Sequence, residues 1–215
     1  MKSLNQYIQE KLTIDKDYQD AMIVVKSFDE LRKIIEDRYD ELGAGTKENP
    51  IDFNDIDVSN MDSFYSSNRD EGIFENTYFK YIDISSWDVS NMKSTSHMFY
   101  CCEELESVGD ISKWDVSKVI NMSFMFSECK KFNQDISNWD VSKVSNMSFM
   151  FCDCHCLNPD LSDWDVSNVT DMWHMFYGCK SFNQDISDWD VLKVKFKTHI
   201  FLNCPIKEEY KPKFK

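Results

Sequence analysis

Residues 132–154 read FNQDISNWDVSKVSNMSFMFCDC, and residues 182–204 repeat them as FNQDISDWDVLKVKFKTHIFLNC. The tripeptide Trp-Asp-Val begins at Trp87, Trp114, Trp139, Trp164 and Trp189. The spacings are 27, 25, 25 and 25 residues, and a degenerate copy begins at Ile56 with an insertion over 68–79. A fixed period of this length indicates a repeat architecture, in which each unit buries its apolar face only by stacking on its neighbours.

Each repeat predicts a strand followed by a short helix. The pattern Ile-x-x-Trp-x-Val places apolar side chains at period two, which is typical of a leucine-rich-repeat strand. Further along, Met122, Met125, Phe126 and Cys129 lie at i, i+3, i+4 and i+7, which is one face of a helix. Asn121 precedes them as a good N-cap residue. We therefore expect strand, turn, capped helix of about two turns and loop in each coil.

The first 50 residues do not fit the repeat and predict a helical or α/β N-terminal cap. Residues 4–12 favour a short amphipathic helix and residues 22–25 a strand. A capping box over Ser27–Glu30 opens a helix that continues to Leu42 and that Gly43 and Gly45 terminate. The expected fold class is α/β: this cap over 1–50, a right-handed leucine-rich-repeat-like solenoid of about six coils over 51–204, and a basic tail over 205–215.

The repeated run Phe-Asn-Gln-Asp-Ile-Ser-x-Trp-Asp-Val, from Phe132 and from Phe182, is followed by Met-x-x-Met-Phe-x-x-Cys after the first of them. This pattern resembles the BspA-like family of bacterial leucine-rich-repeat surface proteins, over about residues 51–204. The resemblance implies a solenoid with a binding role, since members of that family are described as adhesins. Short chains with a similar cap and no export signal also resemble proteins carried by phages of gut bacteria.

The charge of the chain argues against one large class of partners. The formal net charge is −14, and such a chain repels phosphate backbones, so we expect no nucleic acid partner. Residues 189–215 differ, because they hold seven Lys against three acidic residues. The N-terminal residues contain no apolar run of signal-peptide or membrane-spanning length. We therefore expect no membrane insertion, and a protein that is cytoplasmic or part of an assembled particle. The sequence does not indicate an oligomeric state.

The residues that flank Trp and Val predict a binding face on the outer side of the strands. An Asp follows each Trp, and the residue before Trp varies from coil to coil, as expected of a position without a packing role. Like charges opposite each other in neighbouring strands are destabilising, which leaves two explanations. Each Asp accepts hydrogen bonds from an adjacent turn, or the face is an acidic docking surface for a basic protein or for cations. The candidate residues are Asp88, Lys113, Asp115, Asn138, Asp140, Asp163, Asp165, Asp188 and Asp190.

The Cys and His residues are expected to pack rather than to bind a metal or another cofactor. Cys102, Cys129, Cys154, Cys179 and Cys204 share one column, where a free Cys behaves as a small apolar side chain. The cluster at residues 152–156 matches no common zinc spacing. The column of His97, Phe124, Phe149, His174 and His199 predicts aromatic packing between coils or a partly exposed apolar stripe, with a His174–His199 metal pair as the less favoured alternative.

No phosphate-binding loop and no nucleophile motif occurs, so we expect a protein that is not an enzyme. The favoured function is a protein–protein interaction module that binds a basic partner through the acidic face. The alternative is a structural component of a virion or cell-surface assembly that docks through its terminal caps.

Overall fold

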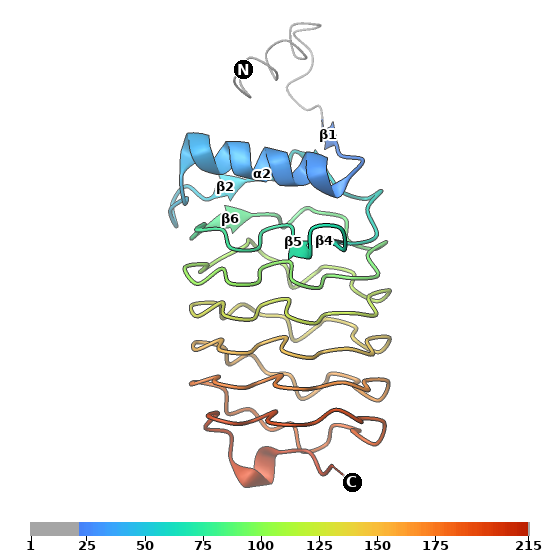
Figure 1. Cartoon of the computed structure of the whole chain (residues 1–215). Coiled ribbons are helices and arrows are strands. Elements are labelled where there is room, and N and C mark those ends of the chain that lie inside the picture. Colours follow the sequence, from blue (N-terminus) through green and yellow to red (C-terminus); the bar gives the residue numbers. More distant parts are fainter. Residues whose placement is uncertain (1–21, 215) are drawn as a thin grey trace, which may run out of the picture.

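The computed structural model describes residues 22–214. Successive turns of the chain lie one above another, with helix α2 (Phe28–Leu42) across the N-terminal end and a short 3-10 helix (Glu208–Tyr210) at the C-terminal end (Figure 1). The name coil is used below for each full turn of the chain in this stack, one for each copy of the repeat. The terminal elements are the only regular helices within residues 22–214.

The N-terminal cap forms as its sequence predicts. The strand expected over residues 22–25 is β1 (Ile23–Val24), and α2 begins after Ser27, whose hydroxyl accepts the N–H of Glu30 at 3.2 Å. At the other end, Gly43 takes φ 74° and donates its N–H to the Tyr39 carbonyl at 2.8 Å. This left-handed conformation suits Gly, because it has no Cβ. The helix expected over residues 4–12 lies outside the described residues.

Short strands connect the cap to the first turns of the stack. β1 pairs in parallel with β3 (Ile56–Asp57), and β2 (Ile51–Asp52) pairs in parallel with β6 (Ile82–Asp83). Within the insertion, β4 (Tyr65–Ser66) and β5 (Glu71–Gly72) form an antiparallel hairpin. Farther down the stack the parallel contact continues as single bridges at one position per coil, through Ser63, Ser94, Asn121, Asn146, Asp171 and Phe196.

The helices predicted within the coils are wrong: segments such as 122–129 are tandem turns. The N–H of Met125 donates to the Met122 carbonyl, three residues back, at 3.2 Å. The N–H of Phe124 instead donates to Ser148 in the next coil, at 3.0 Å. Phe124 takes φ 58°, which an α-helix cannot contain. Every second N–H group in this segment therefore bonds to the adjacent coil. The inward side chains nevertheless have the i, i+3, i+4 and i+7 spacing of one face of a helix.

The strand predicted around each Trp is also a pair of turns. The N–H of Trp114 donates to Ile111 at 3.2 Å and that of Val119 to Val116 at 2.9 Å. The parallel contacts between coils run instead through the segment that starts at Asn121. Side chains along these turns also alternate between the core and the solvent, as they do along a strand. Trp114 is buried and the next residue, Asp115, is exposed.

The predicted core residues are buried, and two of their columns bond to the backbone of the preceding coil. The indole N–H of Trp139 donates to the Ile111 carbonyl at 2.9 Å, and Trp87, Trp164 and Trp189 make the matching bond. Cys154 Sγ donates to the Phe126 carbonyl at 2.7 Å, and Cys102, Cys129 and Cys179 do the same one coil apart. The predicted packing role is therefore confirmed for these four Cys residues, whereas Cys204 is only partly buried.

Trp114 departs from this pattern. Its indole N–H is buried and has no acceptor among the described residues. Trp114 follows the one interval of 27 residues among the Trp-Asp-Val tripeptides. The added length lies near 107–109, where Ile82 and Ile84 of the preceding coil donate their N–H groups to Ser107 and Val108.

The C-terminal tail closes the lower end of the core. Tyr210 accepts the N–H of Ile186 at 3.0 Å, and the side chains of Ile206 and Pro212 are buried beneath the last coil.

Candidate functional site

The predicted face is exposed and runs the length of the stack. All nine candidate residues, which we call the acidic face, are exposed. They are Asp88, Lys113, Asp115, Asn138, Asp140, Asp163, Asp165, Asp188 and Asp190. Because each coil repeats the same positions relative to Trp, the structure brings them together as two parallel rows.

Each Asp that follows a Trp closes a local turn. Oδ1 of Asp115 accepts the N–H of Ser117 at 3.0 Å, and Asp140 and Asp165 accept from Ser142 and Ser167 at the same distance. Asp88 and Asp190 make the equivalent bond. This is an Asx turn, in which the carboxylate replaces a backbone carbonyl. The structural explanation of the Asp ladder therefore holds, while the carboxylates still face solvent.

At Asp115 and Asp165 these turns favour the charged form of the carboxylate. Hydrogen bonds from Ser117, first from its side chain and then from its backbone, lower the pKa of Asp115 below its ordinary value. Ser167 lowers the pKa of Asp165 in the same way. Donors directed at a carboxylate favour its charged form. Lys118 and Lys143 also lower the pKa of Asp115, so nearby cations reduce the repulsion between stacked Asp residues.

Sequence reasoning missed a second acidic column, four residues before Trp. Asp110, Asp135, Asp160 and Asp185 are exposed, and each accepts an N–H through Oδ1 from the Ser two residues later. The pKa of Asp135 is lowered, mainly by the side chain of Ser137 and then by its N–H. The signal was the repeated Asp-Ile-Ser before Trp. With both columns, the turn-bearing side of the stack carries many more Asp than Lys.

The variable position before Trp has no such turn. The side chains of Lys113, Asn138, Asp163 and Asp188 are exposed and make no hydrogen bond with the described residues. Substitutions there can therefore alter the chemistry of the surface without breaking a turn, which suits positions that determine specificity.

The aromatic column forms a continuous stack along another side. Ring centroids lie 4.6 Å apart for His97 and Phe124, 4.5 Å for Phe124 and Phe149, and 4.8 Å for Phe149 and His174. His174 Nε2 lies 3.3 Å from Nδ1 of His199. The predicted aromatic packing between coils is confirmed, although it joins turns rather than helices. Burial lowers the pKa of His174, so the imidazole favours its neutral form.

The Cys/His cluster at 152–156 splits between the inside and the outside of the stack. Cys154 points into the core, whereas Cys156 is exposed. Burial raises the pKa of Cys152 to about 12. Within residues 22–214, no group of three or more His, Cys, Asp or Glu side chains is arranged to hold a metal ion.

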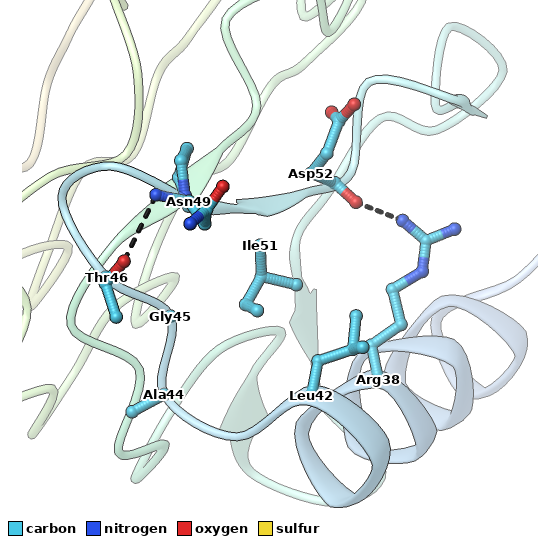
Figure 2. Close-up of a pocket in the computed structure, with 9 residues that line it drawn as sticks. Arg38, Leu42, Ala44, Gly45, Thr46, Asn49, Ile51 and Asp52 are labelled. Carbon is cyan, nitrogen blue, oxygen red and sulfur yellow. Dashed lines mark hydrogen bonds between the residues drawn. The ribbon is translucent and has the colours of Figure 1, made fainter.

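A pocket lies between the end of α2 and β2, as Figure 2 shows. Its charged group, Arg38, is already used within the protein. Arg38 donates to both carboxylate oxygens of Asp55, at 2.8 and 2.6 Å, and to the Asp52 carbonyl. It also lies 5.0 Å from the centroid of the Phe53 ring. These contacts dock the cap on the stack, and they leave the pocket without an unpaired cation to bind an anionic ligand.

No helix within residues 22–214 has the length and apolar character needed to cross a bilayer.

Comparison with known proteins yields one match. A family model described as "Mycoplasma protein of unknown function, DUF285" matches residues 46–109 and 104–211, which together include most of the chain and all the coils. No curated protein and no solved structure matches the chain.

Proposed function

The chain belongs to the DUF285 family of Mycoplasma proteins of unknown function, and we propose that it acts as a non-enzymatic protein-interaction module. The binding surface in this proposal is the acidic face, and the partner is a basic protein. The observation that carries it is the exposed Asp row, which Asx turns hold at a fixed position in every coil.

We propose that the stacked coils are a right-handed leucine-rich-repeat-like solenoid of the BspA-like type, with tandem turns in place of the short helices. The regular parallel bridges from Ser63 to Phe196 support it. Solenoids present extended surfaces of repeated residues, and partners bind there.

A regular row of negative charges can attract a basic partner toward the acidic face before the two proteins make contact. The charged columns generate one extended negative potential, which accelerates encounter with a basic surface and weakens as salt rises. The variable residues Lys113, Asn138, Asp163 and Asp188 would then select among basic partners.

The test uses substitutions that keep the turns intact. Asn retains the Oδ1 acceptor and removes the charge, so Asp115→Asn, Asp140→Asn and Asp165→Asn together should leave the melting temperature nearly unchanged. A pull-down with this triple variant should lose a partner that the intact chain retains at low salt. The matched control removes three charges from the cap, by Asp40→Asn, Glu41→Gln and Glu48→Gln. Equal retention by the Asp115 variant and the intact chain would contradict the proposal.

A second candidate is a structural component of a particle or surface layer that docks through its ends. The exposed apolar side chains of the last coil, Leu192, Phe196 and Leu202, favour it. Removing residues 205–215 would then abolish assembly, whereas the Asn substitutions on the acidic face would leave assembly unchanged.

A further inference from the structure

In the segment that follows the bridge position of each coil, the backbone hydrogen bonds to neighbouring coils run in one direction. The N–H groups of Met172, His174, Phe176 and Gly178 donate downward to the next coil, at 2.9–3.2 Å. The coil above bonds in the same sense, since Met147, Phe149, Phe151 and Asp153 donate to Asp171, Trp173, Met175 and Tyr177. Each of these segments thus accepts bonds from above and donates bonds below.

In the part of the chain that the structure describes, no further coil lies beneath the last one to receive its donors. Within residues 22–214, the backbone N–H groups of His199, Phe201 and Asn203 have no hydrogen-bond acceptor. Their counterparts in the coil above are all bonded. The carbonyls of His199 and Phe201 are occupied by the turns, because they accept the N–H groups of Leu202 and Cys204. This edge, residues 199–203, therefore offers donors and is called the donor edge.

The surroundings of the donor edge are basic and apolar. Lys195 and Lys197 are exposed on the same coil, beside Phe196, which is 60% exposed. The other coils carry Ser, Asn or Asp in the column of Phe196. Leu202 lies within the edge and is 45% exposed. In the tail below, Glu208 is paired with Lys211.

The donor edge offers backbone N–H groups whose neighbouring carbonyls are already bonded, and this restricts which ligands can bind to it. A second copy placed end to end would set donors against donors and Lys against Lys. A regular β-strand presents N–H groups together with its carbonyls, so half of its groups would also face donors. A carboxylate presents acceptors alone, and N–H to carboxylate bonds are charge-assisted.

We propose that the donor edge binds an extended Asp/Glu-rich segment of a partner protein, with apolar residues of that segment against Phe196 and Leu202. The carboxylates accept from the N–H groups of His199, Phe201 and Asn203, and Lys195 and Lys197 add attraction. Short edges of this kind commonly recruit a segment of another chain. This site is separate from the acidic face, has the opposite charge preference and does not depend on the proposed function.

The experiment measures binding of a short fluorescein-labelled peptide, in which Asp and Glu alternate with Leu and Phe, to the full chain by fluorescence anisotropy. We expect saturable binding that weakens with salt, and no binding of a peptide with Asn and Gln in place of the acids. The variant Lys195→Glu/Lys197→Glu should bind about tenfold more weakly or worse. The matched control Lys118→Glu/Lys143→Glu, which changes the same charge elsewhere on the stack, should bind like the intact chain.

Amide hydrogen exchange followed by NMR identifies the donors directly. In the chain alone, the N–H groups of His199, Phe201 and Asn203 should exchange much faster than those of His174 and Phe176. Bound peptide should slow the first set and leave the second unchanged. The proposal fails if the peptide does not bind, if both charge variants weaken equally, or if the three N–H groups stay unprotected. A concentration-dependent dimer that the Lys195→Glu/Lys197→Glu variant abolishes would instead identify a second copy as the occupant.

Discussion

Trp114 and Trp139 occupy the same column of neighbouring coils, and only Trp139 has an acceptor for its indole N–H. Trp139→Phe removes the bond to the Ile111 carbonyl and leaves that carbonyl without it. Because that carbonyl still accepts the backbone N–H of Trp114 at 3.2 Å, the expected loss is about 0.5–1.5 kcal/mol beyond the loss of packing. Trp114→Phe removes instead a buried donor that has no acceptor among the described residues, which offsets the packing loss by about 1–3 kcal/mol.

Both side chains are nearly fully buried, 6% exposed for Trp114 and 3% for Trp139, so the packing loss from the smaller ring is similar. The two variants should therefore differ in free energy of unfolding by about 2 kcal/mol or more, with Trp139→Phe the less stable. For a chain of 215 residues, that difference corresponds to about 4–8 °C in melting temperature.

The assay is urea denaturation of the full chain followed by circular dichroism, comparing midpoints at equal slopes. Trp164→Phe is the internal control, because its indole bonds to Ile136 at 3.2 Å, and it should follow Trp139→Phe. The reasoning is refuted if Trp114→Phe destabilises the protein as much as Trp139→Phe.

Three further predictions test the turns, the thiols and the carboxylates. Phe149 has φ 56°, so Phe149→Gly should be about 1 kcal/mol more stable than Phe149→Ala in urea, whereas a helix would give the reverse order. Under native conditions, iodoacetamide followed by mass spectrometry should modify exposed Cys156 rapidly, and buried Cys154, whose pKa burial raises well above the ordinary value, only after unfolding. Because the pKa values of Asp115 and Asp165 are lowered in the folded state, their stabilisation is complete above the unfolded pKa and is lost as pH falls below about 4. Melting temperatures across pH should therefore fall less steeply in the Asp115→Asn/Asp165→Asn variant, and an identical acid dependence would contradict this assignment.

The sequence predicts three features correctly: the repeat period, the buried position of each repeated apolar residue, and the N-terminal cap. Each depends either on residues close together in the chain or on a pattern that recurs in every repeat. Ser27 and Gly43 bound α2 by chemistry that operates within one helical turn. The burial of Trp139 and Cys154 follows from position in the repeat.

The path of the backbone between the inward residues could not be predicted. Met122, Met125, Phe126 and Cys129 have helical spacing, yet they lie on tandem turns. Phe124 gives no residue-type signal for a positive φ, which ordinarily favours Gly or Asn. The cost of that conformation is offset by stacking on His97 and Phe149 and by the bond to Ser148, contacts that exist only once coils are assembled.

For the candidate site, the exposed rows could be identified from the repeat, whereas the Asx turns of Asp115 and its equivalents needed the backbone conformation. The donor edge had no sequence signal beyond the change from polar residues to Phe196, because it depends on the direction of hydrogen bonds between coils.

The pattern of hydrogen bonds between coils is the same at each junction, so the coils can be joined in one orientation, like monomers in a head-to-tail polymer. A unit such as residues 139–163 repeats the donors and acceptors of its neighbours at the same positions, so duplicating or deleting it reconnects matching groups. The length of the molecule can therefore change by whole units, through gene duplication or by design, while the helix-covered end and the basic end keep their chemistry. The distance between those two ends is then an adjustable property, set by the number of units and independent of what either end contacts.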